Sequence, residues 1–513
     1  GAVGLLGSRT RSFAIASSAN PLAITQHGDV RGYSDNSISV FKGIRYAADT
    51  RERRFMPPQH PEPWTKAVDA FEYGAAAPQD QGSEPMSEDC LFLNVWTPGL
   101  ESAAKRPVLF YIHGGAYSHG SGSSPLYDGA ELARRGDVVV VTVNHRLNAL
   151  GYLYLQRFDA ADYADSGNVG QLDLVLALQW VRQNIANFGG DPLRVLAFGQ
   201  SGGGAKIATM MAMPAAKDLF QRAATMSGQQ VTVSGPANAK LRTAAYTDAI
   251  GIAADDVESL RSMPLDKLLA GLAAADPVLH YGSVYFGPVL DMRSLTRHPF
   301  YPDAAGQSAH IPMIIGNTRD ETRAFLRDPR YYELRWEELP ELLIPNLRVD
   351  IPPEFVIAEY RRIYPGYSAS QVFFAATTAA RSWRAAIIEA EERAKQGRDN
   401  TFVYQLDWPS PLEPHLGAPH TLDIPLVFGN LDAEGSITGT GSEASAVSAM
   451  MSDAFIAMAR DGKPRSAKLP DWNPYTLAGR ETMIMAMPPR MENDPRGAER
   501  RLFERVPYIQ PGS

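Results

Sequence analysis

One serine lies between glycines at a point where the chain is predicted to change from strand to helix. The segment Gly199-Gln200-Ser201-Gly202-Gly203 follows a short apolar run, 195–198, and precedes small residues, 204–213, that predict a helix. Glycines on both sides let the backbone turn sharply, so the Ser201 hydroxyl is held above the sheet. The N–H groups that begin the helix, including that of Gly202, then point towards a developing oxyanion. This setting predicts nucleophilic attack by Ser201.

A second loop could supply more N–H donors to the same oxyanion. The apolar run 107–112 leads into His113-Gly114-Gly115-Ala116. Small residues let the backbone approach a substrate closely, so the N–H groups of Gly115 and Ala116 are candidate donors. The alternative is a glycine turn that only joins a strand to a helix.

A serine hydroxyl is a poor nucleophile and needs a base, which in turn needs an orienting acid. Among the histidines after Ser201, His415 and His420 lie just beyond a predicted strand, 402–406, on a segment expected to be a loop. Catalytic groups are common on such loops. Asp320 and Glu321 follow another predicted strand, 313–315, and either carboxylate could instead cap the next helix.

These residues need a scaffold that brings distant segments together. Apolar runs that predict strands alternate with helical stretches, such as 170–187 and 375–395. This alternation predicts an α/β fold with a mostly parallel central sheet and helices on both faces. The run 138–143 is β-branched and predicts a buried central strand. The segment 435–448 is rich in Gly, Ser, Thr and Ala and is expected to be a mobile loop.

Several motifs resemble the type-B carboxylesterase family, which includes the cholinesterases. The matching segments are Phe41-Lys42-Gly43-Ile44-Arg45-Tyr46-Ala47, Ser87-Glu88-Asp89-Cys90-Leu91-Phe92-Leu93-Asn94, Asn187-Phe188-Gly189-Gly190-Asp191-Pro192, and the histidine loop 417–429 with Val427-Phe428-Gly429. The resemblance covers almost the whole chain. It implies an α/β-hydrolase fold and a bacterial serine carboxylesterase that acts on small-molecule esters.

The resemblance also implies roles for individual residues. It identifies Ser201 as nucleophile, Glu321 as acid and His420 as base, with Gly115, Ala116 and Gly202 as the oxyanion hole. No cofactor and no metal are expected, because the sequence has no ligand cluster at zinc spacing and no phosphate-binding loop. A lipase acting on longer glycerides, or a binding protein of the same fold without catalysis, are the alternatives.

The chain departs from the family at two places. Gln200 and Gly202 stand where the family commonly has Glu and Ala, and Gln200 removes a carboxylate that would favour a cationic substrate. Arg45, Arg51, Arg53 and Arg54 form a basic loop, with Arg45 where the family often has Pro. This loop is expected to be solvated or, alternatively, to contact a carboxylate on the substrate. Cys90 is the only cysteine, so no intrachain disulfide can form, and it is expected to be a buried apolar residue.

Composition limits the partners. The 513 residues carry a net charge of −8 without a long basic block, which argues against nucleic acid. No run of 18 apolar residues predicts a membrane span. Residues 1–20 resemble the remnant of an export signal or a disordered extension, which predicts a periplasmic or secreted bacterial protein. Residues 21–513 are expected to form a single domain, as a monomer or homodimer.

Overall fold

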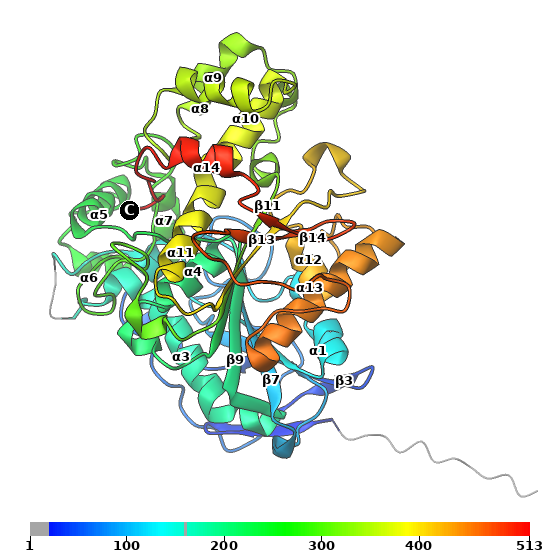
Figure 1. Cartoon of the computed structure of the whole chain (residues 1–513). Helices are drawn as coiled ribbons and strands as arrows, with labels where there is room; N and C mark the ends of the chain where they lie inside the picture. Colours follow the sequence, from blue (N-terminus) through cyan, green and yellow to red (C-terminus); the bar gives the residue numbers. More distant parts are fainter. Residues whose placement is uncertain (1–19, 159–161) are drawn as a thin grey trace, which may run out of the picture.

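A mixed eleven-stranded sheet forms the centre of the molecule (Figure 1). The computed structural model describes residues 20–158 and 162–513. Its strand order is β14-β13-β12-β11-β10-β9-β7-β8-β6-β4-β3, and a separate small sheet has the order β1-β2-β5. The predicted export-signal segment lies almost wholly outside the described residues and, with the predicted single domain, stays a prediction.

The strands are short at the edges and longest at the centre. Their bounds are β1 Leu22–Thr25, β2 Gly28–Arg31, β3 Tyr33–Asp35, β4 Ile38–Arg45, β5 Val68–Asp69, β6 Phe92–Thr97, β7 Arg106–Ile112, β8 Val139–Val143, β9 Gly190–Gln200, β10 Arg222–Met226, β11 Met313–Thr318, β12 Thr401–Leu406, β13 Glu481–Met485 and β14 Arg490–Asn493. In the order of the sheet, the neighbouring strands β13, β12, β11, β10, β9, β7 and β8 pair in parallel. The strands at both edges pair antiparallel. The predicted mostly parallel sheet is confirmed.

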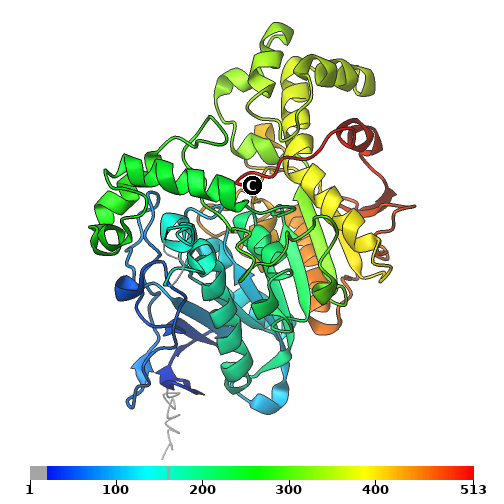
Figure 2. The ribbon, with the colours of Figure 1, turned by 90° about the vertical axis from the view of Figure 1, so that its left-hand side faces the viewer.

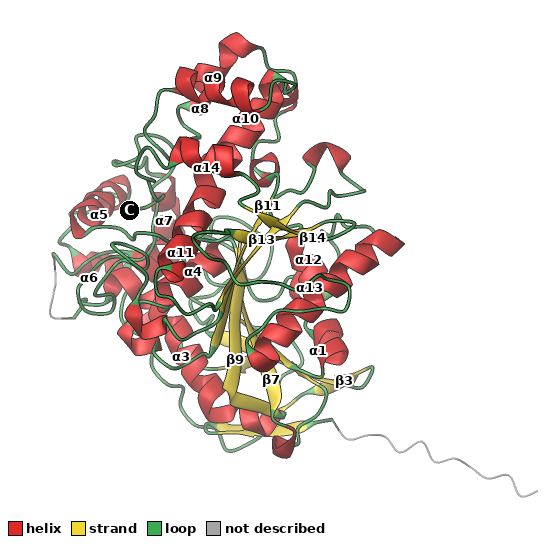
Figure 3. Ribbon diagram, viewed as in Figure 1, coloured by secondary structure: helices red, strands yellow, loops and turns green. Residues whose placement is uncertain are grey.

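Helices cover both faces of this sheet, as Figure 3 shows. Their bounds are α1 Ala130–Gly136, α2 Asn148–Tyr152, α3 Val169–Asn184, α4 Gly202–Met210, α5 Pro236–Ala249, α6 Val257–Ser262, α7 Leu265–Ala270, α8 Leu339–Leu343, α9 Pro353–Ile363, α10 Ala369–Thr378, α11 Arg384–Ala394, α12 Asp423–Phe428, α13 Ser442–Asp461 and α14 Gly497–Phe503. Helices α8 to α10 gather beyond one end of the sheet (Figure 2) and pack around a hydrophobic cluster of their own. None of the helices in the described part of the chain is long and apolar enough to span a bilayer.

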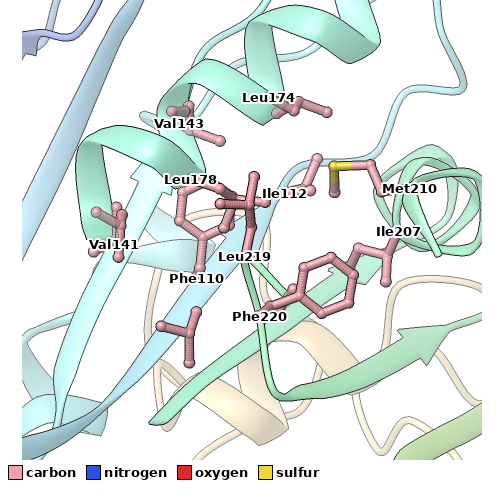
Figure 4. Packing of buried hydrophobic residues seen from close by; sticks show 14 of the residues in the cluster. Phe110, Ile112, Val141, Val143, Leu174, Leu178, Ile207, Met210, Leu219 and Phe220 are labelled. Carbon is pink, nitrogen blue, oxygen red and sulfur yellow. The ribbon is translucent and has the colours of Figure 1, made fainter. Parts of the chain in front are cut away.

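Alternation along β7 explains why both faces are buried. Successive side chains of a strand point to opposite faces. Phe110 and Ile112 join one cluster with residues of α3 and α4 (Figure 4), whereas Leu109 and Tyr111 join the other with α1, α12 and α13. β7 therefore contributes to two cores, one on each face of the sheet.

Two predicted elements differ from the structure. The expected loop 435–448 ends at Ser442, where α13 begins, because Ala444, Val447 and Met451 on one helical face are buried against the sheet. The predicted helix 375–395 is interrupted by a π-helical segment, Ala379–Trp383, between α10 and α11. Inside it Arg381 has φ −103° and ψ −107°, which is not helical.

The basic loop is only partly solvated. Arg45 forms a two-bonded ion pair with Asp89 (2.6 and 2.7 Å), and Arg54 forms one with Glu88 (2.6 and 2.8 Å). Arg54 is only 8% exposed and also donates to the carbonyls of Arg261 and Met263. The expected solvation is therefore wrong for Arg54, whereas the Arg51 side chain is exposed, and a contact of this loop with the substrate stays a prediction.

Cys90 is buried, as predicted, and no cysteine faces it. Burial away from water raises the pKa of its thiol well above the ordinary value. The thiol therefore packs as a small apolar group.

Candidate active site

The serine elbow forms between β9 and α4. Ser201 has φ 55° and ψ −126°, a backbone conformation that L-residues adopt rarely, and its N–H donates to the Met226 carbonyl (2.8 Å). A Cβ at Gly203 would lie 1.9 Å from the Ile112 carbonyl oxygen, so only glycine fits there. The close packing of β7 against the elbow therefore requires glycine at position 203. Ser201 itself lines a cavity of about 130 Å³.

Two backbone segments meet beside Ser201. Gly115 and Ala116 have φ 88° and 51°, and within the described ranges neither N–H donates a hydrogen bond. Gly202 is the first residue of α4, so its N–H has no partner inside the helix. A Cβ at Gly202 would lie 2.0 Å from the Ala116 carbonyl oxygen. This contact gives a physical reason for glycine at a position where the family commonly has alanine.

His420 and Glu321 form a buried pair. The Nδ1 of His420 lies 2.5 Å from Oε2 of Glu321, whose Oε1 accepts from the Thr318 N–H (2.9 Å) and the Asn317 amide (3.2 Å). Burial alone would raise the pKa of Glu321, but the facing His420, the Ser227 hydroxyl and the Thr318 N–H hold it below its ordinary value. Glu321 is therefore an anion at neutral pH and can accept a hydrogen bond from Nδ1 of His420.

The rival residues lie elsewhere. Asp320 turns away from His420, accepts from the Ala418 N–H (3.0 Å) and lies 3.5 Å from Arg323. It holds the histidine loop in place without touching the imidazole. The His415 side chain is more than half exposed and faces Glu413. Geometry thus brings together Glu321 and His420, and leaves Asp320 and His415 outside the pair.

Gln200 does not line the substrate cavity. It is buried, and its Nε2 lies 3.1 Å from Nε2 of His420. Within the described residues no hydrogen bond joins Ser201 Oγ to His420, and the Gln200 amide is the group that contacts Nε2 of the imidazole. A charge at residue 200 would act directly on the imidazole, and its effect on the choice of substrate charge stays a prediction.

A buried lysine beside the oxyanion loop was not anticipated from the sequence. Lys206 on α4 is fully buried, donates to the Ala116 carbonyl (2.7 Å) and lies 4.9 Å from the centre of the Tyr117 ring. This hydrogen bond holds the Ala116 carbonyl, which is the same carbonyl that packs against Gly202. The available signal was one lysine within an otherwise small and apolar helix, Gly202–Met210. Close by, the rings of His113 and His145 stack, and burial lowers the pKa of His113 to about 3.

The ionisation of Lys206 should be visible in thermal stability. Burial lowers its pKa to about 7 from an ordinary value of 10.5, so between these pH values the unfolded chain binds more protons than the folded protein. The free energy of unfolding therefore rises with pH across this window, by up to about 1.4 kcal/mol per pH unit. In Lys206→Met this contribution is absent. The rise in Tm between pH 7 and 9 should therefore be smaller in this variant than in the wild type, and the difference between the two rises should be about 2 °C or more.

Scanning calorimetry at one fixed scan rate measures this difference. Lys217→Met is the matched control, because Lys217 is exposed and follows the short helix Pro214–Ala216, and this variant should keep the wild-type dependence of Tm on pH. Parallel curves for the wild type and Lys206→Met would show that Lys206 does not titrate in this range.

Two cavities meet at the elbow. The one beside Ser201 is also lined by Arg381 and Tyr508, and a second of about 240 Å³ is lined by Leu272, Val284 and Phe286. Ala116, Tyr117 and Tyr285 belong to both walls. Across residues 20–158 and 162–513, no group of three or more His, Cys, Asp or Glu side chains is arranged to hold a metal ion.

Comparisons with known proteins agree with this geometry. Residues 19–503 match the carboxylesterase family. The chain is 36% identical to para-nitrobenzyl esterase of Bacillus subtilis over 499 residues, which is 94% of this chain and 98% of that protein. It is 34% identical to phenmedipham hydrolase of Pseudarthrobacter oxydans, covering 88% of this chain and 92% of that protein.

A solved structure extends the likeness to the fold. The carboxylesterase EST55 of Geobacillus stearothermophilus superimposes with a TM-score of 0.84 at 38% identity, covering 94% of this chain and 99% of that one. Sequence and fold thus match over nearly the full length of each relative. The chain belongs to the carboxylesterase family and is a hydrolase of carboxylic esters with the α/β-hydrolase fold.

Proposed function

We propose that this esterase works through an acyl-enzyme on Ser201. His420 takes the proton from Ser201 Oγ as the oxygen attacks the ester carbonyl, and Glu321 orients the imidazole and stabilises its charged form. His420 then returns the proton to the leaving alcohol, and water repeats the sequence on the acyl-enzyme. The buried Glu321–His420 contact beside the strained elbow is the observation that carries this proposal.

The N–H groups of Gly115, Ala116 and Gly202 would stabilise the oxyanion. Their lack of other acceptors supports this role, since such donors gain most when charge develops on the carbonyl oxygen. Before attack, the imidazole must exchange the Gln200 amide for Ser201 Oγ at Nε2. Catalytic hydrogen bonds are often loose without substrate and tighten when it binds.

Small esters are the proposed substrates, because the cavities at the elbow measure only about 130 and 240 Å³. Across p-nitrophenyl esters from acetate to palmitate, kcat/KM should fall by about tenfold or more once the acyl chain exceeds these cavities. With tributyrin, the rate should saturate below the solubility limit. A rate that climbs when an emulsion forms, or a preference for palmitate, would instead indicate a lipase.

A further inference from the structure

Within the part of the chain that the structure describes, one arginine in the catalytic cavity lacks a counter-charge. Arg381 and Ser201 line the same cavity. Among the described residues no carboxylate lies within 4 Å of the Arg381 guanidinium, which instead lies 4.9 Å from the centre of the Phe325 ring. The ring of Phe325 is in turn 4.8 Å from that of His420. The cation and the catalytic imidazole thus contact the same phenyl ring.

The backbone departs from a regular helix at this residue. Arg381 lies inside the π-helical segment Ala379–Trp383, with φ and ψ that no helix adopts. Single π turns within α-helices are frequent at functional sites, and sparsely populated backbone conformations persist only where the surroundings hold them. The distortion is located at the residue that carries the unpaired charge into the cavity.

The surroundings do not neutralise this charge. Burial, and after it the like charge of Arg348, lower the pKa of Arg381, whereas Tyr508, Tyr285 and Glu321 act in the opposite direction. Arg348 itself donates to the Tyr281 hydroxyl (2.7 Å). Glu321 is already paired with His420.

A buried carboxyl group behind the same cavity wall does not compensate the positive charge of Arg381 either. Glu389 accepts from the N–H of the wall residue Gln230 (2.7 Å), and burial raises the pKa of Glu389 to about 8. Burial therefore favours the uncharged form of Glu389. This side of the cavity is positive, and a partly buried guanidinium without a partner is costly unless a ligand supplies the anion.

We propose that the cavity takes esters that carry a second, ionised carboxylate, which Arg381 binds while Ser201 attacks the ester carbonyl. A guanidinium presents two parallel N–H donors that match a carboxylate. Half-esters of dicarboxylic acids are the simplest members of this class. Water adds across the acyl–oxygen bond, and the products are a dicarboxylate and an alcohol. This inference rests on the proposed function of Ser201.

The test compares an anionic ester with its neutral isostere. In the wild type, kcat/KM for monoethyl glutarate should exceed that for ethyl glutaramate by about ten- to a hundredfold. This factor corresponds to the free energy of a hydrogen bond to a charged group. Arg381→Gln should bring this ratio close to one, and Arg381→Lys should restore part of it. Added salt should lower the wild-type ratio because it screens the attraction.

A control variant, an inhibition measurement and a second pair of esters distinguish the ways in which this test could fail. Arg361→Gln is the control, because Arg361 lies on the exposed surface of α9 against Trp336 and should keep the wild-type ratio. In the wild type alone, free glutarate should inhibit more strongly than glutaramide, whether or not the Arg381 variants fold. A second pair, 4-acetoxybenzoate and 4-acetoxybenzamide, places the charge on the alcohol, and a preference in either pair supports the proposal.

A wild-type ratio near one in both pairs, or a preference that survives in folded Arg381→Gln, would overturn the anionic subsite. In that case hydrolysis of the neutral ester through Ser201 would leave the proposed function standing. Failure of the wild type to hydrolyse any of the four esters would count against the proposed function itself.

Discussion

Ser201→Ala should lower kcat/KM for p-nitrophenyl acetate by about 10⁴-fold or more, because loss of the nucleophile removes the acyl-enzyme route and leaves only binding and oxyanion stabilisation. The variant should fold normally. Alanine lacks only Oγ, which makes no hydrogen bond among the described residues, and it fits the same backbone conformation as serine. Steady-state kinetics with a matched Tm measurement checks both parts.

Covalent labelling locates the nucleophile directly. Diethyl p-nitrophenyl phosphate should modify the peptide that contains Ser201 in the wild type, and mass spectrometry should find this peptide unmodified in Ser201→Ala. Labelling on another residue, or an alanine variant with near-normal turnover, would remove Ser201 from the mechanism.

Glu321→Gln should reduce kcat by about 10⁴-fold, as expected when an imidazole loses the charge that sets its tautomer. The neutral amide no longer stabilises the imidazolium that forms at His420, although it keeps the size of the side chain. Asp320→Asn is the matched control, since this carboxylate contacts Ala418 and Arg323 and not the imidazole. Its loss should cost less than about tenfold, because the amide oxygen of asparagine can still accept from the Ala418 N–H.

Values of kcat for both variants over pH 5–9 provide the measurement. If Asp320→Asn were the more severe change, the acid would have to be reassigned to Asp320, and the contact between Glu321 and His420 would be structural only.

Local constraint explains which parts of the site could be predicted from the sequence. The elbow at Ser201 and the loop at Gly115 depend on glycines and on neighbouring apolar strands, so a short segment determines their backbone. Asp320 and Glu321 are adjacent and chemically alike, and the sequence leaves both open without the family resemblance. Only the turn after β11 decides that Glu321 faces the imidazole while Asp320 holds the loop.

Residues that act across long sequence separations were missed or misread. Arg54 pairs with Glu88, and Gln200 contacts His420, over separations of 34 and 220 positions. Arg381 lies in a stretch with a regular helical pattern, and nothing in that pattern marks the π turn. The start of α13 was missed because small residues favour a loop locally, whereas burial of Val447 and Met451 favours a helix.

The isolation of Cys90 makes the protein convenient for site-specific attachment. It is the only thiol in the chain, it is buried, and its raised pKa keeps it protonated and slow to react with maleimides. A cysteine placed at any exposed position would therefore be the single reactive handle for a fluorophore or a solid support. The enzyme could be immobilised in a chosen orientation, with the cavity facing the solvent, without first removing its native cysteine.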